Sequence, residues 1–267
     1  MLKLEMPTLR EILEEAGGNE ELLEELLDKF RLWLKQQLHL PQDISEQRLK
    51  VYIYSAKFNL EKAKRRLDLH YTLRNLVPEV YSNYDPLSDS ITQIMKCVYF
   101  CMIMDIRIEE DIVNSDVFIF DFTNFTLGHI LKYTPPILKK IDIILEAYGT
   151  RIKAIHMINT SNYIDILITL CKSVMKPKLT KRIHVYPSGA ESLYEMIPRS
   201  ILPVDFGGEQ PSLDTIADMW QAKLMQQREW FLEQEKVKVN ESLRSNSVIK
   251  PDDLFGVSGT FRKLNID

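Results

Sequence analysis

The first forty residues carry apolar side chains at the three- and four-residue spacing of an amphipathic helix. The spacing is clearest in NEELLEELLDKFRLWLKQQL, which begins at Asn19 and ends shortly before Pro41. Asn19 is a suitable N-cap, because its side chain can accept a hydrogen bond from the first turn of a helix. Pro41 lacks the amide hydrogen that a continuing helix needs. We therefore expect one amphipathic helix between these two residues.

Two shorter helical patterns follow, over 44–55 and 59–75, and Asn59 is the expected cap of the second. Residues 1–77 thus predict a small helical bundle. The stretch PEVYSNYDPLSDS, from Pro78 onward, is rich in turn-forming residues and predicts an irregular linker.

Beyond the linker, helical patterns alternate with short apolar runs rich in β-branched and aromatic residues. The runs that predict strands are 116–122, 151–158 and 182–186. The stretches that predict helices are 90–105 (apolar on nearly every side), 134–148, 161–177, 190–197 and a long polar one at about 212–244. This alternation predicts an α/β fold, with a small and mostly parallel sheet after the helical bundle.

The composition is that of an ordinary globular protein: of 267 residues, 45% are hydrophobic and 27% are charged, so a core can form without disulfides. A net charge of −4 argues against a nucleic-acid partner held by overall positive charge. Three cysteines cannot build a disulfide framework and suit a reducing compartment, which predicts a cytoplasmic protein. The sequence has no run of roughly 18 apolar residues and no apolar N-terminal signal, so we expect neither a membrane span nor a secretory leader.

Catalytic and cofactor motifs are missing from the sequence. There is no GxSxG, no GxGxxG and no GxxxxGK[ST], and the histidines show no HxxxH spacing. His156 and His184 lie inside predicted strands, where histidine is usually a satisfied structural residue. Asp121, at the end of the first predicted strand, is expected to cap the next loop rather than to act as an acid. We expect no catalytic residue, no metal and no cofactor; a hydrolase is our weakest hypothesis, because no triad motif supports it.

The most distinctive segment is SNYIDILITLCKSVMKPKLTKR, residues 161–182. Its apolar residues cover most of the circumference of a helix rather than one stripe: Tyr163, Ile164, Ile166, Leu167, Ile168, Leu170, Val174 and Met175. The bases of its second half have no acid among them: Lys172, Lys176, Lys178, Lys181 and Arg182. An apolar helix that runs into a basic stretch suits a protein that touches an anionic membrane. A buried core helix with a solvated charged end explains the same pattern, and the residues alone do not choose between the two.

Four stretches, in order, resemble the CRAL-TRIO lipid-transfer family, in its branch of tocopherol and retinaldehyde carriers. YSAKFNLEKAKRRLDLHYTLRNLVPEVYSNYDP is similar to the helical N-terminal module of the family. VFIFDFTNFTLGHI resembles its central strand and the turn D-x-x-x-x-(S/T)-L-x-H, here Asp121, Thr126, Leu127 and His129. RIKAIHMINTSNYIDILITLCKSVMKPKLTKRIHVY resembles a strand, the gate helix and the next strand, and ILPVDFGGE resembles the closing LP-x-x-(Y/F)-G-G. The resemblance covers about residues 20–230.

The resemblance implies a helical module at 1–80, a lipid-binding domain at 88–230, and a helix end and tail at 231–267. It implies a soluble, non-enzymatic carrier that holds one lipophilic molecule in a cavity between the sheet and the gate helix and transfers it between membranes. The residues that would line the cavity are Met102, Met104, Phe118, Phe120, Ile158, Tyr163, Ile164, Leu167, Ile168, Leu170 and Val174. The bases that would contact an anionic bilayer or a phosphoinositide are Lys172, Lys176, Lys178, Lys181 and Arg182. We expect a monomer that docks on membranes transiently and binds no nucleic acid.

The sequence departs from the family pattern in two places. Family members have a first strand between the linker and the buried helix, and here only LSDS, residues 87–90, fills that gap. Where phosphoinositide-binding carriers have a base just before KF, this chain has Ala56. Because a missing strand could open the cavity, our alternative hypothesis is a degenerate CRAL-TRIO scaffold that binds a phosphoinositide or a protein without carrying a ligand.

Overall fold

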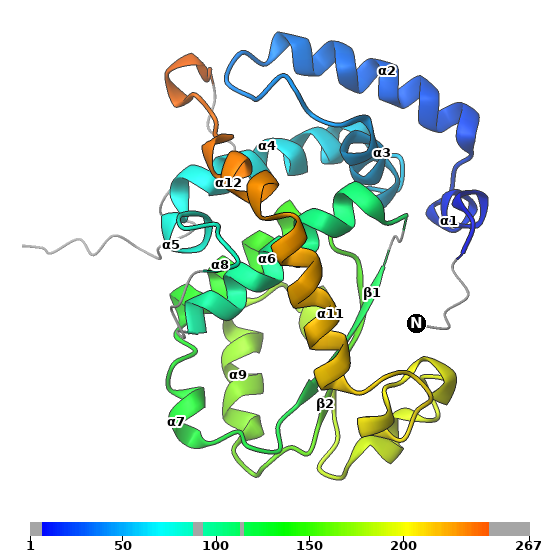
Figure 1. Ribbon diagram of the computed structural model, residues 1–267, viewed down its shortest axis with the longest axis vertical. Coiled ribbons are helices and arrows are strands. Elements are labelled where there is room, and N and C mark those ends of the chain that lie inside the picture. The colour runs from blue at the N-terminus through cyan, green and yellow to red at the C-terminus, as the bar shows by residue number, and fades with distance from the viewer. Residues whose placement is uncertain (1–6, 88–92, 113–114, 246–267) are drawn as a thin grey trace, which may run out of the picture.

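The computed structural model describes residues 7–87, 93–112 and 115–245 (Figure 1). The helices of its N-terminal part are α1 (Leu9–Ala16), α2 (Glu20–Gln36), α3 (Glu46–Ser55), α4 (Leu60–Leu76) and the short α5 (Pro78–Tyr81). The two predicted caps are confirmed: the side chain of Asn19 accepts a hydrogen bond from the Leu22 amide at 2.8 Å, and Asn59 accepts one from the Lys62 amide at 2.9 Å. The linker prediction was partly wrong, because α5 is a helical turn that Pro78 can begin without losing a hydrogen bond.

A long helix, α6 (Gln93–Glu110), joins the helical bundle to the sheet and packs against α3 and α5. It carries Asp105, which is fully buried. Arg74 of α4 donates to this carboxylate at 2.7 Å and Tyr84 at 2.8 Å, while the guanidinium of Arg48 from α3 lies 3.5 Å from it. Burial acts to lower the pKa of Arg74, but Asp105, Tyr84 and Tyr148 together raise it by more. The buried charges therefore fix α3, α4 and α6 relative to one another, a role that the apolar pattern of α6 does not indicate.

The sheet has, within the described residues, three parallel strands in the order β1 (Asp116–Asp121), β2 (Ile152–Ile158) and β3 (Ile183–Val185). The helices of the first crossover are α7 (Leu127–Ile130) and α8 (Pro135–Ala147), and those of the second are α9 (Ile164–Val174) and α10 (Pro177–Thr180). Helical crossovers are what parallel pairing requires. The three predicted strands and the α/β fold are confirmed, and among the described residues β1 has a neighbouring strand on one side only.

The strand register decides which side chains share a face. Phe118 pairs with Ile155, and Ile155 with Ile183, and residues paired in parallel strands lie on the same face. This face packs on α8 and α9 through a group of side chains that we call the sheet–α9 cluster. Its buried members are Phe122, Ile130, Leu138, Ile152, Ile155, Met157, Ile164, Leu167 and Cys171. The other face includes Ile158, which packs against the segment that follows β3.

The helix predicted over 190–197 was wrong. The chain forms short 3₁₀ turns there and beyond: η1 (Ala190–Leu193), η2 (Arg199–Ile201) and η3 (Val204–Phe206). The eight predicted positions lie between Gly189 and Pro198, which leaves too few residues for a stable α-helix. The helix predicted over 161–177 is likewise divided into α9 and α10, because Pro177 begins a new turn rather than continuing the old one.

The single long helix predicted at about 212–244 was also wrong. It is α11 (Leu213–Gln226) followed by α12 (Arg228–Lys236), and the two helices meet at Gln227. After α12 the chain leaves the helical conformation in a stretch that contains Val237 and Val239, whose β-branched side chains disfavour a helix. A final turn, η4 (Glu241–Leu243), precedes the predicted tail, of which residues 246–267 lie outside the described part of the chain.

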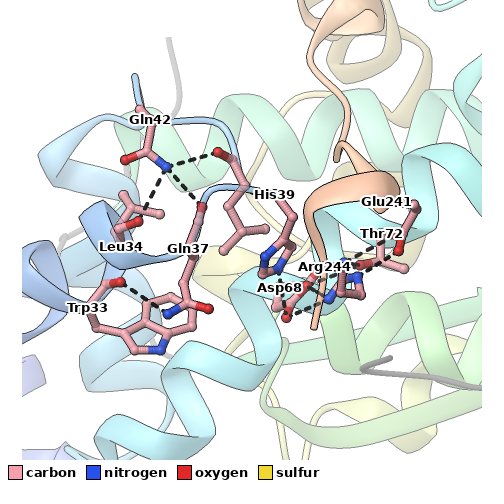
Figure 2. A network of polar contacts seen from close by, with 10 residues as sticks. Trp33, Leu34, Gln37, His39, Gln42, Asp68, Thr72, Glu241 and Arg244 are labelled. Carbon is pink, nitrogen blue, oxygen red and sulfur yellow. Dashed lines mark hydrogen bonds and ion pairs between the residues drawn. The ribbon is translucent and has the colours of Figure 1, made fainter. Parts of the chain in front are cut away.

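The segment after α12 returns to the N-terminal helices (Figure 2). Arg244 donates to both carboxylate oxygens of Asp68, at 2.8 and 2.9 Å, and to the Thr72 hydroxyl at 2.7 Å. His39 lies 3.4 Å from the same carboxylate, and its carbonyl accepts a hydrogen bond from the Asn240 amide at 2.9 Å. The Arg244 side chain is only 4% exposed. This polar network attaches the segment after α12 to α4 and to the loop after α2.

Candidate functional site

The turn after β1 is held by local hydrogen bonds. Asp121 accepts hydrogen bonds from the Thr123 amide at 2.9 Å and from the Asn159 side chain at 3.0 Å. Burial acts to raise the pKa of Asp121, but these hydrogen bonds favour the charged carboxylate and leave the pKa below its ordinary value. At the start of α7, the Thr126 amide donates to His129 Nδ1 at 3.0 Å. Asp121 therefore caps the loop as predicted, and the motif that it shares with Thr126 and His129 fixes the position of α7.

The predicted gate helix, α9, covers one face of the sheet. Its residues Ile164, Leu167 and Cys171 are buried in the sheet–α9 cluster. Burying Ile164 and Leu167 contributes about 2 kcal/mol each. On the outer side, Tyr163 and Ile166 are half exposed. Asp165, Thr169, Lys172 and Ser173 are exposed on the same side. One side of the helix is therefore core, and the other carries exposed apolar residues among polar ones.

Nine of the eleven residues predicted to line a cavity divide among three hydrophobic clusters, and the exposed Phe120 and Tyr163 belong to none of them. Those in or against the sheet–α9 cluster are Phe118, Ile164, Leu167, Ile168, Leu170 and Val174. Met102 and Met104 belong to the large cluster of the helical bundle, and Ile158 belongs to a small cluster on the other face of the sheet. The structure thus brings six of the eleven predicted residues together around α9.

Two predicted wall residues stack on β1. The ring centroids of Phe118 and Phe120 are 6.1 Å apart and the rings are nearly parallel, as expected for residues two apart on one face of a strand. Phe118 also lies 6.1 Å from the ring of Phe100 on α6. Among the described residues β1 has no further strand beside it, and Phe120 remains half exposed. The two rings form an open apolar margin of the sheet.

Met104 borders a small cavity between α3, α6 and the start of β1, which Ser55, Asp116 and Tyr148 also line. Its volume of about 30 Å³ is the space of roughly one water molecule. This cavity cannot hold a lipid, and Met104 lies in it rather than beneath α9.

Basic side chains from α4 and α10 come together in the structure. We call them the α4–α10 basic cluster, and they are Lys62, Arg65, Arg66, Lys176 and Lys178. The pKa of Lys62 is lowered, first by burial and then by the positive charges of Arg66, Lys178 and Lys176. These charges therefore lie close enough to repel one another, and a bound anion would relieve the repulsion.

Glu146 of α8 is a carboxylate within this cluster. It forms an ion pair with Lys176 and lies 3.4 Å from Arg65. One carboxylate does not neutralise the bases around it, and the Nε atom of Arg66 is buried without a hydrogen-bond partner among the described residues. Our sequence reasoning missed Lys62, Arg65 and Arg66, although the run KAKRR at 62–66 was the available signal.

The other predicted bases lie elsewhere. Lys172 and Lys181 are exposed. The guanidinium of Arg182 donates to the carbonyl of Ile152 at the start of β2. The structure therefore brings Lys176 and Lys178 together with α4 but leaves Arg182 at the sheet.

The strand histidines are structural, as predicted. His156 is buried, and its Nδ1 atom lies 3.2 Å from the Tyr186 hydroxyl. Its ring stacks on that of His184, with centroids 5.3 Å apart. No group of three or more His, Cys, Asp and Glu side chains in the described part of the chain could hold a metal ion. No helix in that part is both long enough and apolar enough to cross a bilayer.

The LP-x-x-F-G-G stretch packs the segment that follows β3 against the sheet. Leu202 and Phe206 are buried beside Ile158 of β2. Gly207 has a φ of +70°, which glycine adopts without strain. A Cβ atom on Gly208 would lie 2.0 Å from the carbonyl oxygen of Leu202, so only glycine fits this close backbone approach.

A helical bundle followed by a small parallel sheet with helical crossovers defines an α/β protein. Residues 69–208 match the CRAL/TRIO domain, and the chain belongs to this family. Members of this family bind and transfer lipids and are not enzymes, so the expected class of protein is confirmed. Residues 19–91 also match the Pinta-like UBA domain, which covers most of the helical bundle.

Curated relatives agree with this family. The chain is 26% identical over 236 residues to the alpha-tocopherol transfer protein-like protein of Mus musculus, covering 75% of this chain and 68% of the relative. It is 32% identical over 134 residues to Clavesin-1 of Rattus norvegicus, covering 50% of this chain and 38% of the relative. It is 31% identical over 146 residues to Clavesin-2 of Rattus norvegicus, covering 54% and 44%. The chain therefore spans less than half the length of the clavesins that it matches.

The mouse alignment also indicates an internal difference. It runs over 236 positions but uses only 75% of the 267 residues of this chain, so about one aligned position in seven faces a gap. The relative thus has residues without a counterpart here. This agrees with the short LSDS connection and with a sheet that has three strands in the described residues.

Proposed function

We propose that the protein binds one small lipophilic molecule, of the lipid, retinoid, tocopherol or carotenoid type, between its sheet and α9 and transfers it between membranes. The observation that supports this most is α9, which is buried on the sheet through Leu167 and half exposed at Tyr163 and Ile166. The outer side of α9 also carries the polar residues Asp165, Thr169 and Lys172, and the exposed Ile166 among them is an apolar contact that a core helix does not need. A helix that opens toward a bilayer needs apolar residues on both sides.

The hydrophobic effect is large enough for such a complex. Burying about 400 Å² of apolar ligand surface at about 25 cal/mol/Å² gives a gross stabilisation of about 10 kcal/mol. Ordering of the ligand and of the protein removes several kcal/mol of this. The ligand would be held firmly in water and released when α9 meets a membrane.

We further propose that the protein docks on anionic bilayers that contain phosphoinositides, and that the α4–α10 basic cluster supplies the contact. The repulsion between Lys62, Lys178 and Arg66 supports a phosphate-binding role, because a phosphate group would neutralise it. Exposed Lys172 and Lys181 would add attraction to an anionic surface. The relevant ligand is then a lipid headgroup within a membrane.

The test of the carrier function is identification of a co-purified ligand. The full chain, purified without detergent, would be analysed by native mass spectrometry and by solvent extraction. We expect a lipophilic molecule at one copy per chain. A protein that carries none, and that takes up no fluorescent lipid from vesicles, would contradict the carrier function.

A second candidate is a degenerate scaffold that binds a phosphoinositide or a protein and carries no ligand. It is favoured by the open margin of the sheet, where Phe120 is half exposed beside a strand with one neighbour in the described residues. An empty protein that still sediments with phosphoinositide vesicles would favour the scaffold over the carrier.

A further inference from the structure

The segment after β3, in yellow at the lower right of Figure 1, carries exposed apolar side chains. Ile201 of η2, Val204 of η3 and Leu213 at the start of α11 are 50%, 56% and 43% exposed, and we call them the η3–α11 surface. Hydrogen bonds hold these short elements together: the Val204 amide donates to the Gln210 carbonyl at 3.0 Å, and the Leu213 amide donates to the Asp205 carboxylate at 2.8 Å. The exposed residues are therefore neighbours in space as well as in the chain.

The apolar stripe of α11 is covered at one end only. Leu213, Ile216, Trp220 and Leu224 follow one another at helical spacing. Leu224 is 2% exposed and Trp220 packs against the hydrophobic cluster of the helical bundle, where α11 meets α6. At the other end of the stripe, Leu213 is 43% exposed. The stripe thus continues past its own contact within the chain, and its uncovered end adjoins η3.

The backbone beneath this surface is fixed. Leu202 and Phe206, which alternate with the exposed residues, are buried beside Ile158 of β2. The Tyr194 hydroxyl donates to the Phe206 carbonyl at 3.0 Å. A partner would therefore meet a preformed surface, which lowers the entropic cost of binding.

The side chains around the η3–α11 surface are acidic. Residues 190–218 contain six acids and one base, Arg199. The guanidinium of Arg199 donates to the Gly207 carbonyl at 2.8 Å and lies over the Tyr194 ring, 5.1 Å from its centroid, so it is held by the backbone and a ring rather than by a carboxylate. The six acids are all exposed, and none forms an ion pair with another described residue: Glu191, Glu195, Asp205, Glu209, Asp214 and Asp218.

The sign of these charges selects the occupant. An anionic membrane would be repelled by the uncompensated carboxylates, whereas a cationic partner would be attracted. Apolar anchors within a charged rim are how protein surfaces combine affinity with specificity. We propose that the η3–α11 surface binds a protein partner through a helical segment that carries Lys and Arg around two or three apolar anchors.

The inference does not rest on the proposed carrier function. No residue of the η3–α11 surface belongs to α9 or to the sheet–α9 cluster. Figure 1 shows α9 at the lower left and this segment at the lower right. Because the η3–α11 surface and the α4–α10 basic cluster have opposite charges, one protein could hold a basic partner and an anionic bilayer at the same time.

The test uses the full chain and a defined probe. The probe is a fluorescein-labelled synthetic peptide of about 15 residues, with Leu at helical spacing and Lys at the other positions, and its counterpart has Glu in place of Lys. Fluorescence anisotropy should show binding of the Lys peptide and not of the Glu peptide. Leu213→Ser and Val204→Ser should each weaken binding about fivefold, because a half-exposed apolar side chain loses its contact. Leu32→Ser is the matched control, because Leu32 is 61% exposed on α2, which is also rich in acids, and it should leave binding unchanged.

A second pair of variants tests the charges. Glu209→Gln combined with Asp214→Asn removes two exposed carboxylates beside the apolar residues. Binding of the Lys peptide should fall about threefold and become less sensitive to salt. Glu20→Gln combined with Glu21→Gln removes two exposed carboxylates from the first turn of α2 and should change neither property.

The outcomes decide between the occupants. Absence of binding to the Lys peptide, or binding that Leu213→Ser and Val204→Ser leave unchanged, would overturn the inference. Loss of binding to phosphatidylserine vesicles in these two variants would show a membrane contact instead, and dimers in ultracentrifugation that both variants abolish would show a second copy; either result also overturns it. Thermal unfolding verifies each fold, and Val204→Ser keeps the test valid if Leu213→Ser is unstable. Extraction of a co-purified ligand tests the carrier function separately, so the two can fail independently.

Discussion

Arg244 and Asp68 are 176 residues apart in the chain, and the guanidinium of one donates to both carboxylate oxygens of the other, at 2.8 and 2.9 Å. Removing one partner of a shielded pair leaves the other without compensation. We expect Arg244→Gln to lower the free energy of unfolding by about 2 kcal/mol. Urea titration would measure the loss. The matched control is Arg10→Gln, because Arg10 pairs with Glu14 on an exposed surface and its loss should leave the stability nearly unchanged. Equal losses in the two variants would show that the pair does not hold the segment.

Substitutions at positions 166 and 168 of α9 can test ligand binding and membrane contact separately. Ile168 packs against the sheet–α9 cluster, whereas Ile166 points outward and is half exposed. A carboxylate at position 168 would have to be buried against apolar groups, so Ile168→Asp should reduce uptake of a fluorescent lipid at least about tenfold. Ile166→Asp should keep the uptake and weaken vesicle binding instead. Circular dichroism would verify the fold of both variants, and unchanged uptake by Ile168→Asp would remove α9 from the proposed site.

Reversing one charge of the α4–α10 basic cluster should weaken phosphoinositide binding. Lys178→Glu removes one attractive charge and adds one repulsive charge. Each of these two changes weakens membrane binding by about 1 kcal/mol, so binding should fall at least about tenfold. Sedimentation with phosphatidylcholine vesicles that contain a phosphoinositide would measure it. Lys153→Glu is the control, because Lys153 is an exposed lysine that pairs with Glu15, outside the cluster. If both variants lose binding equally, the attraction comes from overall charge and not from this cluster.

Acid should destabilise the fold through its buried histidines. Burial and the nearby His184 lower the pKa of His156, and burial with Arg48 and Arg74 lowers the pKa of His70 well below its ordinary value. Below about pH 6.5 the unfolded chain binds protons at these positions and the folded chain does not, so stability falls as the pH falls. For each histidine, the free energy of unfolding falls by at most about 1.4 kcal/mol per pH unit. This decline stops below the pKa of the histidine in the folded state. Urea unfolding at a series of pH values should show this decline, and His156→Asn should make it shallower. A decline of unchanged slope in that variant would exclude His156 as a contributor.

The closing glycine turn should not tolerate a methyl group. Gly208→Ala would place a Cβ atom 2.0 Å from the backbone oxygen of Leu202, so the chain must move and the free energy of unfolding should drop by about 2 kcal/mol or more. Gly128→Ala, in α7, meets nothing nearer than 3.6 Å and should leave stability unchanged or slightly higher. Thermal unfolding of the two variants measures the difference. A stable Gly208→Ala variant would show that the turn can open.

Local patterns predicted most of the elements because the chemistry of caps and strands is local. Asn19 and Asn59 cap their helices from neighbouring positions, and the run VFIFDF forms a strand because it is rich in β-branched and aromatic residues. The single helix at about 212–244 could not be recognised as two from helical spacing, because both parts keep it and the break at Gln227 has no proline or glycine.

Contacts between charged residues that are far apart in the chain could not be predicted from the sequence. Lys62 is far from Lys178 in the chain, and only the packing of α4 beside α10 brings their charges together. Likewise Asp105 belongs to an apolar-looking helix, and its partners Arg74 and Tyr84 come from other segments. The helix α9 was predictable because its helical spacing of apolar residues is contained in eleven consecutive positions.

The contact between Arg244 and Asp68 also sets an order of events during protein synthesis. A ribosome that adds about 5 to 20 residues per second needs roughly 10 to 35 seconds to pass from one residue to the other. During that time the helical bundle has been synthesised, but Arg244, whose guanidinium pairs with the carboxylate of Asp68, has not. Nascent chains that stop before Arg244 therefore lack the cation that pairs with Asp68, and the segment after α12 attaches to α4 only once that residue has been added.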